Sequence, residues 1–210
     1  MIRRFGRNSL PGLACILFLA ACSSQPRVVS GPDVRHDLYR ARLDNLEKIT
    51  DWSLEGRLAV NDGKDGGSGH FNWVQEDGAN HMDFHGALGR GAWRLNADQK
   101  EAVLELANGE VYRARTVGEL VFRQLGWKVP VEPLKYWVRG LQAPGQSETL
   151  ELDEQGLPEK LSQFGWEIEF DRYRESMGTA MPGKMTARRD NQTVKLVVRN
   201  WALGPGGGDK

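Results

Sequence analysis

Three polar side chains at alternate positions, His81, Asp83 and His85, come closest to the spacing of a metal site. On a β-strand, residues two apart point to the same face, so these groups would share one side of the strand. Imidazole and carboxylate groups are common zinc ligands. The intervening Met82 and Phe84 are apolar, and this alternation is also typical of a strand with one solvated face. We expect the solvated face and no metal site.

The signatures of common enzyme classes are missing from the sequence. It contains no G-x-S-x-G, H-E-x-x-H or G-x-G-x-x-G motif, which are typical of hydrolases, zinc proteases and dinucleotide-binding enzymes. The glycine-rich stretch from Asp62 to Gly69 does not match the phosphate-loop pattern and is expected to be a loose turn. We therefore predict no catalytic residue, no cofactor and no enzymatic activity.

Cys22 has the clearest chemical assignment. Arg3, Arg4 and Arg7 precede a mostly apolar run, Leu10 to Ala21, whose small last residues lead directly into the cysteine. This is the pattern of a bacterial lipoprotein signal, cut before the cysteine, with diacylglycerol on its sulfur. The run is too short for a transmembrane helix, which needs about 20 residues. The alternative is an ordinary secretory signal with an incidental cysteine.

Lipidation of Cys22 would tether the mature protein to a membrane, because two or more acyl chains anchor stably. Cys15 would leave with the signal, so no free thiol would remain for a disulfide, a zinc site or a nucleophile. By analogy with enterobacterial lipoproteins, Ser23 suggests export to the outer membrane. The expected organisation is a signal peptide (1–21), a flexible lipidated tether (22–32), one folded domain (33–203) and a disordered tail (204–210).

Charge and composition narrow the possible partners. The chain has 28 basic and 28 acidic residues, and removing the three arginines of the signal leaves a net charge of −3 with neutral histidines. Nucleic-acid binding normally requires a basic domain, so we expect no nucleic-acid partner. The seven tryptophans and 25 glycines fit a β-rich protein with many turns and a large apolar interior.

Segments of alternating apolar and polar residues predict about eleven strands. Turn signals separate them, and Asn108-Gly109 is the strongest hairpin dipeptide. The spacing indicates an antiparallel arrangement in which neighbouring segments pair. The expected strands are residues 52–61, 70–76, 80–86, 91–96, 101–107, 110–115, 149–152, 160–164, 166–172, 184–189 and 194–201.

Three helices are expected, over residues 33–50, 116–126 and 130–139. The second begins with a capping box, Thr116-x-x-Glu119, and stops at Gly126. A sheet of eleven strands usually curls into a barrel or splits. A helix between the sixth and seventh strands could cover or plug the concave face.

Large apolar residues recur on one face of the predicted strands and helices. They fill a packed core or line a lipid-sized apolar cavity, and the alternation alone does not distinguish the two. The candidate lining residues are Trp73, Phe84, Trp93, Leu95, Leu104, Leu106, Tyr112 and Trp137.

The loop from Gly86 to Gly91 breaks the alternation, with Leu88 as its one large apolar residue among three glycines. Leu88 either folds back on the sheet edge or projects into a membrane or partner. Arg90 beside it could meet anionic headgroups.

The chain resembles the LolB family of outer-membrane lipoprotein receptors. The resemblance extends from about Trp52 to Leu203 and includes the lipoprotein signal. No single motif is decisive, but the ordered series is specific. The motifs are Gly56-Arg-Leu-Ala59, Phe71-Asn-Trp73-Val-Gln75, Leu88-Gly89, Pro133-Leu-Lys-Tyr-Trp-Val-Arg-Gly140, Ala180-Met-Pro-Gly-Lys-Met185 and Lys195-Leu-Val-Val-Arg-Asn-Trp201.

The resemblance implies a mainly β fold, an incomplete antiparallel β-barrel whose helices cover a hydrophobic cavity. It implies a monomer anchored in the outer membrane and facing the periplasm. Such a receptor accepts acylated lipoproteins from a soluble, LolA-like periplasmic carrier and inserts them into the inner leaflet of the outer membrane, without ATP. The loop leucine that the family uses for membrane insertion corresponds to Leu88, although Gly86-Ala87 replaces the usual Asn-Pro before it.

Two other classes stay open. One is an envelope lipoprotein that binds a different hydrophobic ligand. The other is a structural envelope lipoprotein whose barrel is filled by its own side chains.

Overall fold

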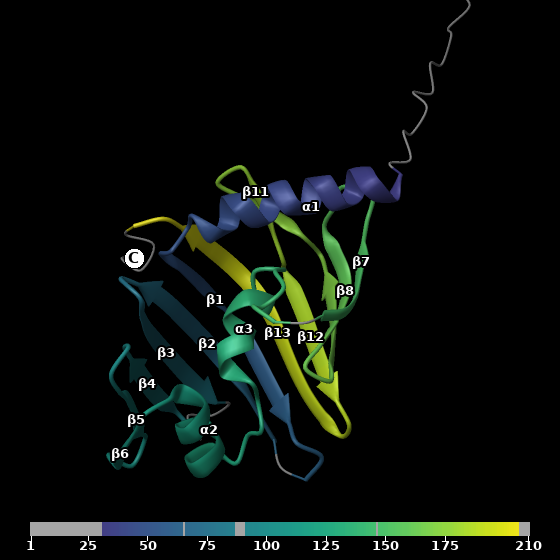
Figure 1. Ribbon diagram of the computed structural model, residues 1–210. Coiled ribbons are helices and arrows are strands. Elements are labelled where there is room, and N and C mark those ends of the chain that lie inside the picture. Colours follow the sequence, from purple (N-terminus) through teal and green to yellow (C-terminus); the bar gives the residue numbers. More distant parts are fainter. Residues whose placement is uncertain (1–30, 65, 87–90, 146, 206–210) are drawn as a thin grey trace, which may run out of the picture.

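The alternating segments pair into one open antiparallel sheet of eleven strands in the computed structural model of the chain, which describes residues 31–64, 66–86, 91–145 and 147–205 (Figure 1). The signal, Cys22, Leu88 and residues 206–210 lie outside the described residues. The sheet strands are β1 (Trp52–Asn61), β2 (Gly66–Glu76), β3 (Ala79–Gly86), β4 (Trp93–Ala97), β5 (Ala102–Leu106), β6 (Val111–Ala114), β7 (Ser147–Leu152), β8 (Pro158–Gln163), β9 (Trp166–Asp171), β12 (Lys184–Arg189) and β13 (Gln192–Leu203).

The strand order is β6-β5-β4-β3-β2-β1-β13-β12-β9-β8-β7. The pairing of β1 with β13 joins the two halves of the chain, and Trp52 lies opposite Leu203. Because β6 and β7 are the edges and do not pair, the sheet curls without closing. The prediction of an incomplete antiparallel barrel with three helices is therefore confirmed.

Two features of the sheet differ from the sequence-based expectation. A short hairpin, β10 (Arg174–Ser176) with β11 (Thr179–Met181), lies outside the main sheet. The predicted glycine-rich turn is also shorter, because β2 begins at Gly66 and its glycines continue the strand. A Cβ at Gly69 would lie 2.2 Å from the carbonyl oxygen of His85, so only glycine fits there.

Three helices complete the part of the fold that the structure describes: α1 (Pro32–Glu47), α2 (Val117–Leu125) and α3 (Val131–Trp137). In Figure 1, α1 crosses one end of the curled sheet, and α2 and α3 lie against its concave side. Tyr39 and Leu46 of α1 are buried, and Leu46 joins the main core. Within the described residues, no helix is both long enough and apolar enough to span a membrane.

Candidate functional site

A small apolar cavity lies between the concave face of the sheet and the segment that runs from α2 to α3. Its sheet side is formed by inward-facing residues of β1 to β4 and β13, which alternate with outward-facing polar residues as a half-buried sheet requires. Every lining side chain is aliphatic, aromatic or a thioether. The sheet residues are Leu58, Val60, Phe71, Trp73, Met82, Trp93 and Val194.

The other side of the cavity is formed by α2, α3 and the loop 126–130 between them, which we call the lid. The lid begins where the Thr116 side chain accepts a hydrogen bond from the Glu119 backbone N–H (3.2 Å), which is the Thr116 half of the predicted capping box, whereas the Glu119 carboxylate pairs with Arg123 (2.6 Å). Helix α2 ends at Gly126, whose φ of 73° is in the left-handed region. The lid residues that line the cavity are Val121, Trp127, Val129, Val131 and Leu134.

Trp127 closes the cavity at the end away from α1. Its ring makes edge-to-face contacts with Phe84 (centroids 5.9 Å, 84°) and with Trp93 (6.1 Å, 72°). A Cβ built on Gly67 would lie 3.6 Å from the Trp127 ring, so the bare backbone of β2 forms the floor beneath that ring. The half-buried Trp127 therefore lies over the part of the cavity beside β2, β3 and β4, which we call the mouth.

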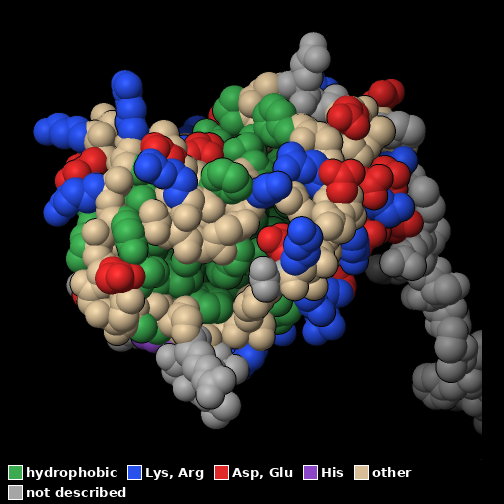
Figure 2. Space-filling view, turned by 90° about the horizontal axis from the view of Figure 1, so that it is seen from below, with side chains coloured by type: hydrophobic (Ala, Val, Ile, Leu, Met, Phe, Trp, Pro, Cys, Tyr) green, Lys and Arg blue, Asp and Glu red, His purple; other side chains and the backbone are tan. Residues whose placement is uncertain are grey.

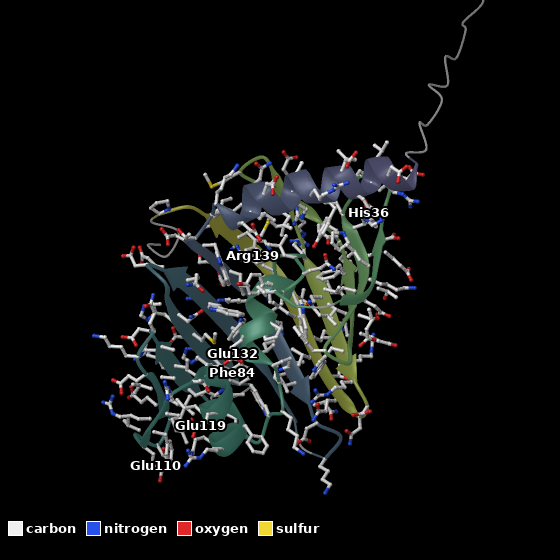
Figure 3. The ribbon with its side chains drawn as sticks, viewed as in Figure 1. His36, Phe84, Glu110, Glu119, Glu132 and Arg139 are labelled. Atoms are coloured by element: carbon white, nitrogen blue, oxygen red, sulfur yellow. The ribbon has the colours of Figure 1, made fainter. Side chains whose placement is uncertain are left out.

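The mouth is at the end of the molecule seen in Figure 2, where apolar side chains gather in a hollow. In Figure 3, Phe84 lies below α3 at the level of α2. Val111 and Phe122, each about half exposed, belong to β6 and α2 beside this end. The surface around the mouth thus offers apolar groups to anything that approaches it.

The cavity is small, with a volume of about 40 Å³. Sites for small molecules usually measure roughly 300–1,000 Å³. Five of the twelve lining residues belong to the lid. A ligand larger than a few atoms can therefore enter only if the lid moves away from the sheet.

The lid is fixed at its C-terminal end, where α3 ends. The indole N–H of Trp137 donates to Gln163 Oε1 (2.9 Å), which also accepts from the Ala143 backbone N–H (3.0 Å). The Gln163 amide nitrogen donates to the Ala143 carbonyl oxygen (2.7 Å). Gln163 is fully buried, and breaking such a network leaves several buried polar groups without partners. We expect the lid to move at Trp127 and to stay fixed at Trp137.

Two arginines hold α1 against the end opposite the mouth. The buried Arg139 donates to the carbonyl oxygens of Leu46 (3.2 Å) and Ile49 (3.3 Å), and its guanidinium lies over the Trp52 ring at 5.6 Å. Arg42 donates to the carbonyl oxygen of Arg139 (2.9 Å). Burial lowers the pKa of both arginines. Figure 3 shows Arg139 directly beneath α1.

The predicted lining residues fall into three groups. Trp73 and Trp93 line the cavity, and Phe84 stacks on Trp93 behind Trp127 (5.5 Å, 14°). Leu95 and Leu104 are fully buried in the same core, and Leu106 and Tyr112 are half-buried beside it. Trp137 lies at the fixed C-terminal end of the lid and not in the cavity wall. The centroid of its ring is 6.3 Å from that of the Trp166 ring.

Trp127 and Gln163, which cover the cavity and fix the lid, were not predicted as site residues. A tryptophan directly after a helix-ending glycine and before a second short helix was an available signal for Trp127. Gln163 had no signal, because its partner Ala143 is 20 residues away along the chain.

The outer face of β3 carries the histidines and aspartate that could have held a metal. His81 and His85 are exposed, the His81 ring contacts Asn96 Oδ1 at 2.7 Å, and Asp83 accepts from Arg94 Nε at 2.9 Å. Among the described residues, no three His, Cys, Asp or Glu side chains form a metal-binding group. The expectation of a solvated strand face agrees with this arrangement.

Comparison with known proteins gives a consistent result. The family described as "Outer membrane lipoprotein LolB" matches residues 50–201. A protein named outer-membrane lipoprotein LolB from Alkalilimnicola ehrlichii is 35% identical over 96% of this chain and 100% of its own length. One of the same name from Pseudomonas aeruginosa is 34% identical over 78% of this chain and 80% of its own.

The fold also occurs among solved structures, one of which has a TM-score of 0.50 to this chain. It is a DUF1329 family protein from Desulfovibrio piger, with 12% identity, covering 83% of this chain and 93% of its own. At that identity the likeness concerns the fold alone.

Proposed function

The chain belongs to the LolB family of outer-membrane lipoproteins, and from this premise we propose that it is a receptor for acylated lipoproteins. It accepts them from a soluble, LolA-like periplasmic carrier and inserts them into the inner leaflet of the outer membrane. The protein itself resides in the outer membrane, held by lipid and facing the periplasm. It acts as a monomeric localisation factor and not as an enzyme.

The observation that carries this proposal is the apolar cavity beneath a lid that is fixed at its C-terminal end. Acyl chains have no polar groups along their length, so a wall of aliphatic and aromatic side chains suits them. Each methylene buried there contributes about 0.8 kcal/mol. Binding of a whole chain therefore provides enough free energy to displace Trp127 and open the lid.

Transfer without ATP follows from the same energetics. The sequence contains no phosphate-loop motif. Cargo that passes from weaker binding on the carrier to tighter binding here, and then into lipid, moves downhill at each step. We propose that no nucleotide is used.

Membrane attachment is assigned to Cys22, which precedes α1 by ten residues. Substituting it with alanine (Cys22→Ala) behind an ordinary cleavable secretory signal should release the protein from membranes while its cavity still accepts cargo, because the anchor is separate from the folded domain. Fractionation of cells into soluble and membrane parts tests this. Unchanged membrane attachment of the variant would contradict the assignment.

Insertion into the membrane is assigned to Leu88. The described residues on either side of its loop, Gly86 at the end of β3 and Gly91 just before β4, connect strands at the mouth end of the sheet. Leu88→Glu should leave cargo acceptance intact and impair insertion, because a charge at that position resists burial in lipid. Leu88→Ile is the matched control. Normal insertion by the glutamate variant would contradict the assignment.

A structural role remains a second candidate, because a cavity of about 40 Å³ is nearly filled by its own side chains. Transfer of cargo distinguishes the two functions. The full-length protein in vesicles is mixed, without ATP, with carrier loaded with a lipoprotein, and vesicles that lack the protein serve as the control.

Two readouts separate acceptance from insertion in this experiment. Cargo that floats with the vesicles has left the carrier, and cargo that then resists alkaline extraction has entered the lipid. Protein-dependent flotation supports the receptor. Cargo that stays on the carrier, with both proteins folded, would favour the structural role.

A further inference from the structure

The indole N–H of Trp93 has no hydrogen-bond acceptor among the described residues, although its atom is sealed from solvent. Trp93 is 7% exposed. Buried donors are nearly always paired in folded proteins, so an unpaired one requires an explanation. Trp73, another of the tryptophans that line the cavity, donates to Asn80 Oδ1 at 3.0 Å.

The surroundings of Trp93 contain rings and hydrocarbon. Its ring is stacked on Phe84 and lies 6.3 Å from Phe71 and 6.1 Å from Trp127. Its strand neighbour on β5 is Leu106. A purely hydrocarbon ligand would leave the N–H unpaired, whereas a ligand with a carbonyl oxygen would satisfy it.

The position of Trp93 along β4 fits the head of an acyl chain. Trp93 is the first residue of β4 and lies at the mouth, whereas Leu95 lies two residues deeper, opposite Met82 and Leu104. An acyl chain that enters with its tail first leaves its carbonyl group near the mouth. The carbonyl oxygen then comes to the level of Trp93.

We propose that Trp93 is a specificity-determining residue, whose indole N–H donates to the carbonyl oxygen of a bound acyl ester or amide. The inference rests on the proposed function and adds a chemical class to it. The cavity selects acyl groups over plain alkyl chains of the same length. Trp127, which lies on Trp93 in the closed lid, must leave before the bond can form.

The test compares two probes that differ at one carbonyl. They are palmitoyl lysophosphatidylcholine, an ester, and its hexadecyl ether analogue, which lacks the carbonyl. The full-length protein is placed in nanodiscs of ether-linked phosphatidylcholine, so that the surrounding lipid supplies no carbonyl. Displacement of a fluorescent apolar dye from the protein gives the affinity of each probe.

The wild-type protein should bind the ester about threefold to tenfold more tightly than the ether, the range expected for one hydrogen bond. Trp93→Phe should bind both equally. Trp166→Phe is the matched control, because the Trp166 N–H is also buried without an acceptor among the described residues, but its ring packs against Trp137 and Arg189, outside the cavity. That variant should keep the preference for the ester.

Equal binding of both probes by the wild-type protein would overturn the role of Trp93 and leave the proposed function standing. Retention of the ester preference by Trp93→Phe would overturn it as well. If neither probe displaces the dye from the wild-type protein, acyl binding itself fails, and with it the proposed function.

A second measurement needs no variant. In wild-type protein with isotope-labelled tryptophan, the ester should shift the Trp93 indole N–H resonance downfield, as hydrogen bonding does, and the ether should not. An identical response to both probes would overturn the inference even if Trp93→Phe does not fold.

Discussion

Removing the Trp127 ring should make the cavity bind apolar ligands more tightly, although the substitution deletes apolar surface. The ring holds the lid shut through its contacts with Phe84 and Trp93. Aromatic pairs of this geometry contribute about 0.5–1.5 kcal/mol each beyond their buried area. Opening the lid of a Trp127→Ala protein should therefore cost about 1–3 kcal/mol less.

That difference predicts an affinity for an apolar dye about fivefold to a hundredfold higher than in the wild-type protein. The dye should also associate faster, because fewer lid contacts must break before it enters. Stopped-flow fluorescence measures both quantities. Phe122→Ala is the matched control, since Phe122 is also on the lid but is 51% exposed and outside the cavity wall.

The substitution should also lower stability. Replacing a buried tryptophan by alanine costs about 3–5 kcal/mol, so a half-buried one should cost about 2 kcal/mol. The expected fall in Tm is about 4–8 °C, and circular dichroism checks that the fold is kept. A folded Trp127→Ala protein that binds the dye no faster and no more tightly than wild type would refute Trp127 as the closing group.

Two further predictions concern the fixed parts of the molecule. Gln163→Leu should lower the free energy of unfolding by about 2–4 kcal/mol in urea titration, because its buried partners lose their bonds. Glu159→Gln, at an exposed position of the same strand, should change it by less than about 0.5 kcal/mol. Equal effects would contradict the role of Gln163. Burial raises the pKa of Tyr39 and Tyr173, so the unfolded chain releases these protons first as the pH rises. The contribution of these two tyrosines to the free energy of unfolding should be full below about pH 10 and should fall above it. Urea titrations in which the free energy of unfolding does not fall between neutral pH and about pH 11 would contradict this.

Strands and turns were predictable because they depend on neighbours in sequence. The alternation around Trp73 or Leu104 is set by the two-residue repeat of a strand, and the capping box at Thr116 acts within one turn of helix. The lid was predicted as two helices for the same reason. These signals are local, and the structure agrees with them.

The closing of the cavity was not predictable in this way. Gly67 looked like part of a loop, but it is a strand residue that lies beside the Trp127 ring, 60 residues further along the chain. Trp137 has the apolar helical spacing of a lining residue, yet its N–H is paired with Gln163 in the other half of the sheet. Such relations depend on which strands meet, and that is fixed only by the folded chain.

The clamp of α1 by Arg139 and Arg42 has a kinetic consequence for a receptor of this kind. Under the proposed function, carrier and bilayer would both use the end of the open barrel at which Trp127 lies, because α1 covers the other end. The two would not fit at that end together, so the receptor would hold its cargo alone between them. Transfer would then follow a ping-pong order, in which the donor departs before the acceptor engages, and excess empty carrier would compete with the membrane for the loaded receptor.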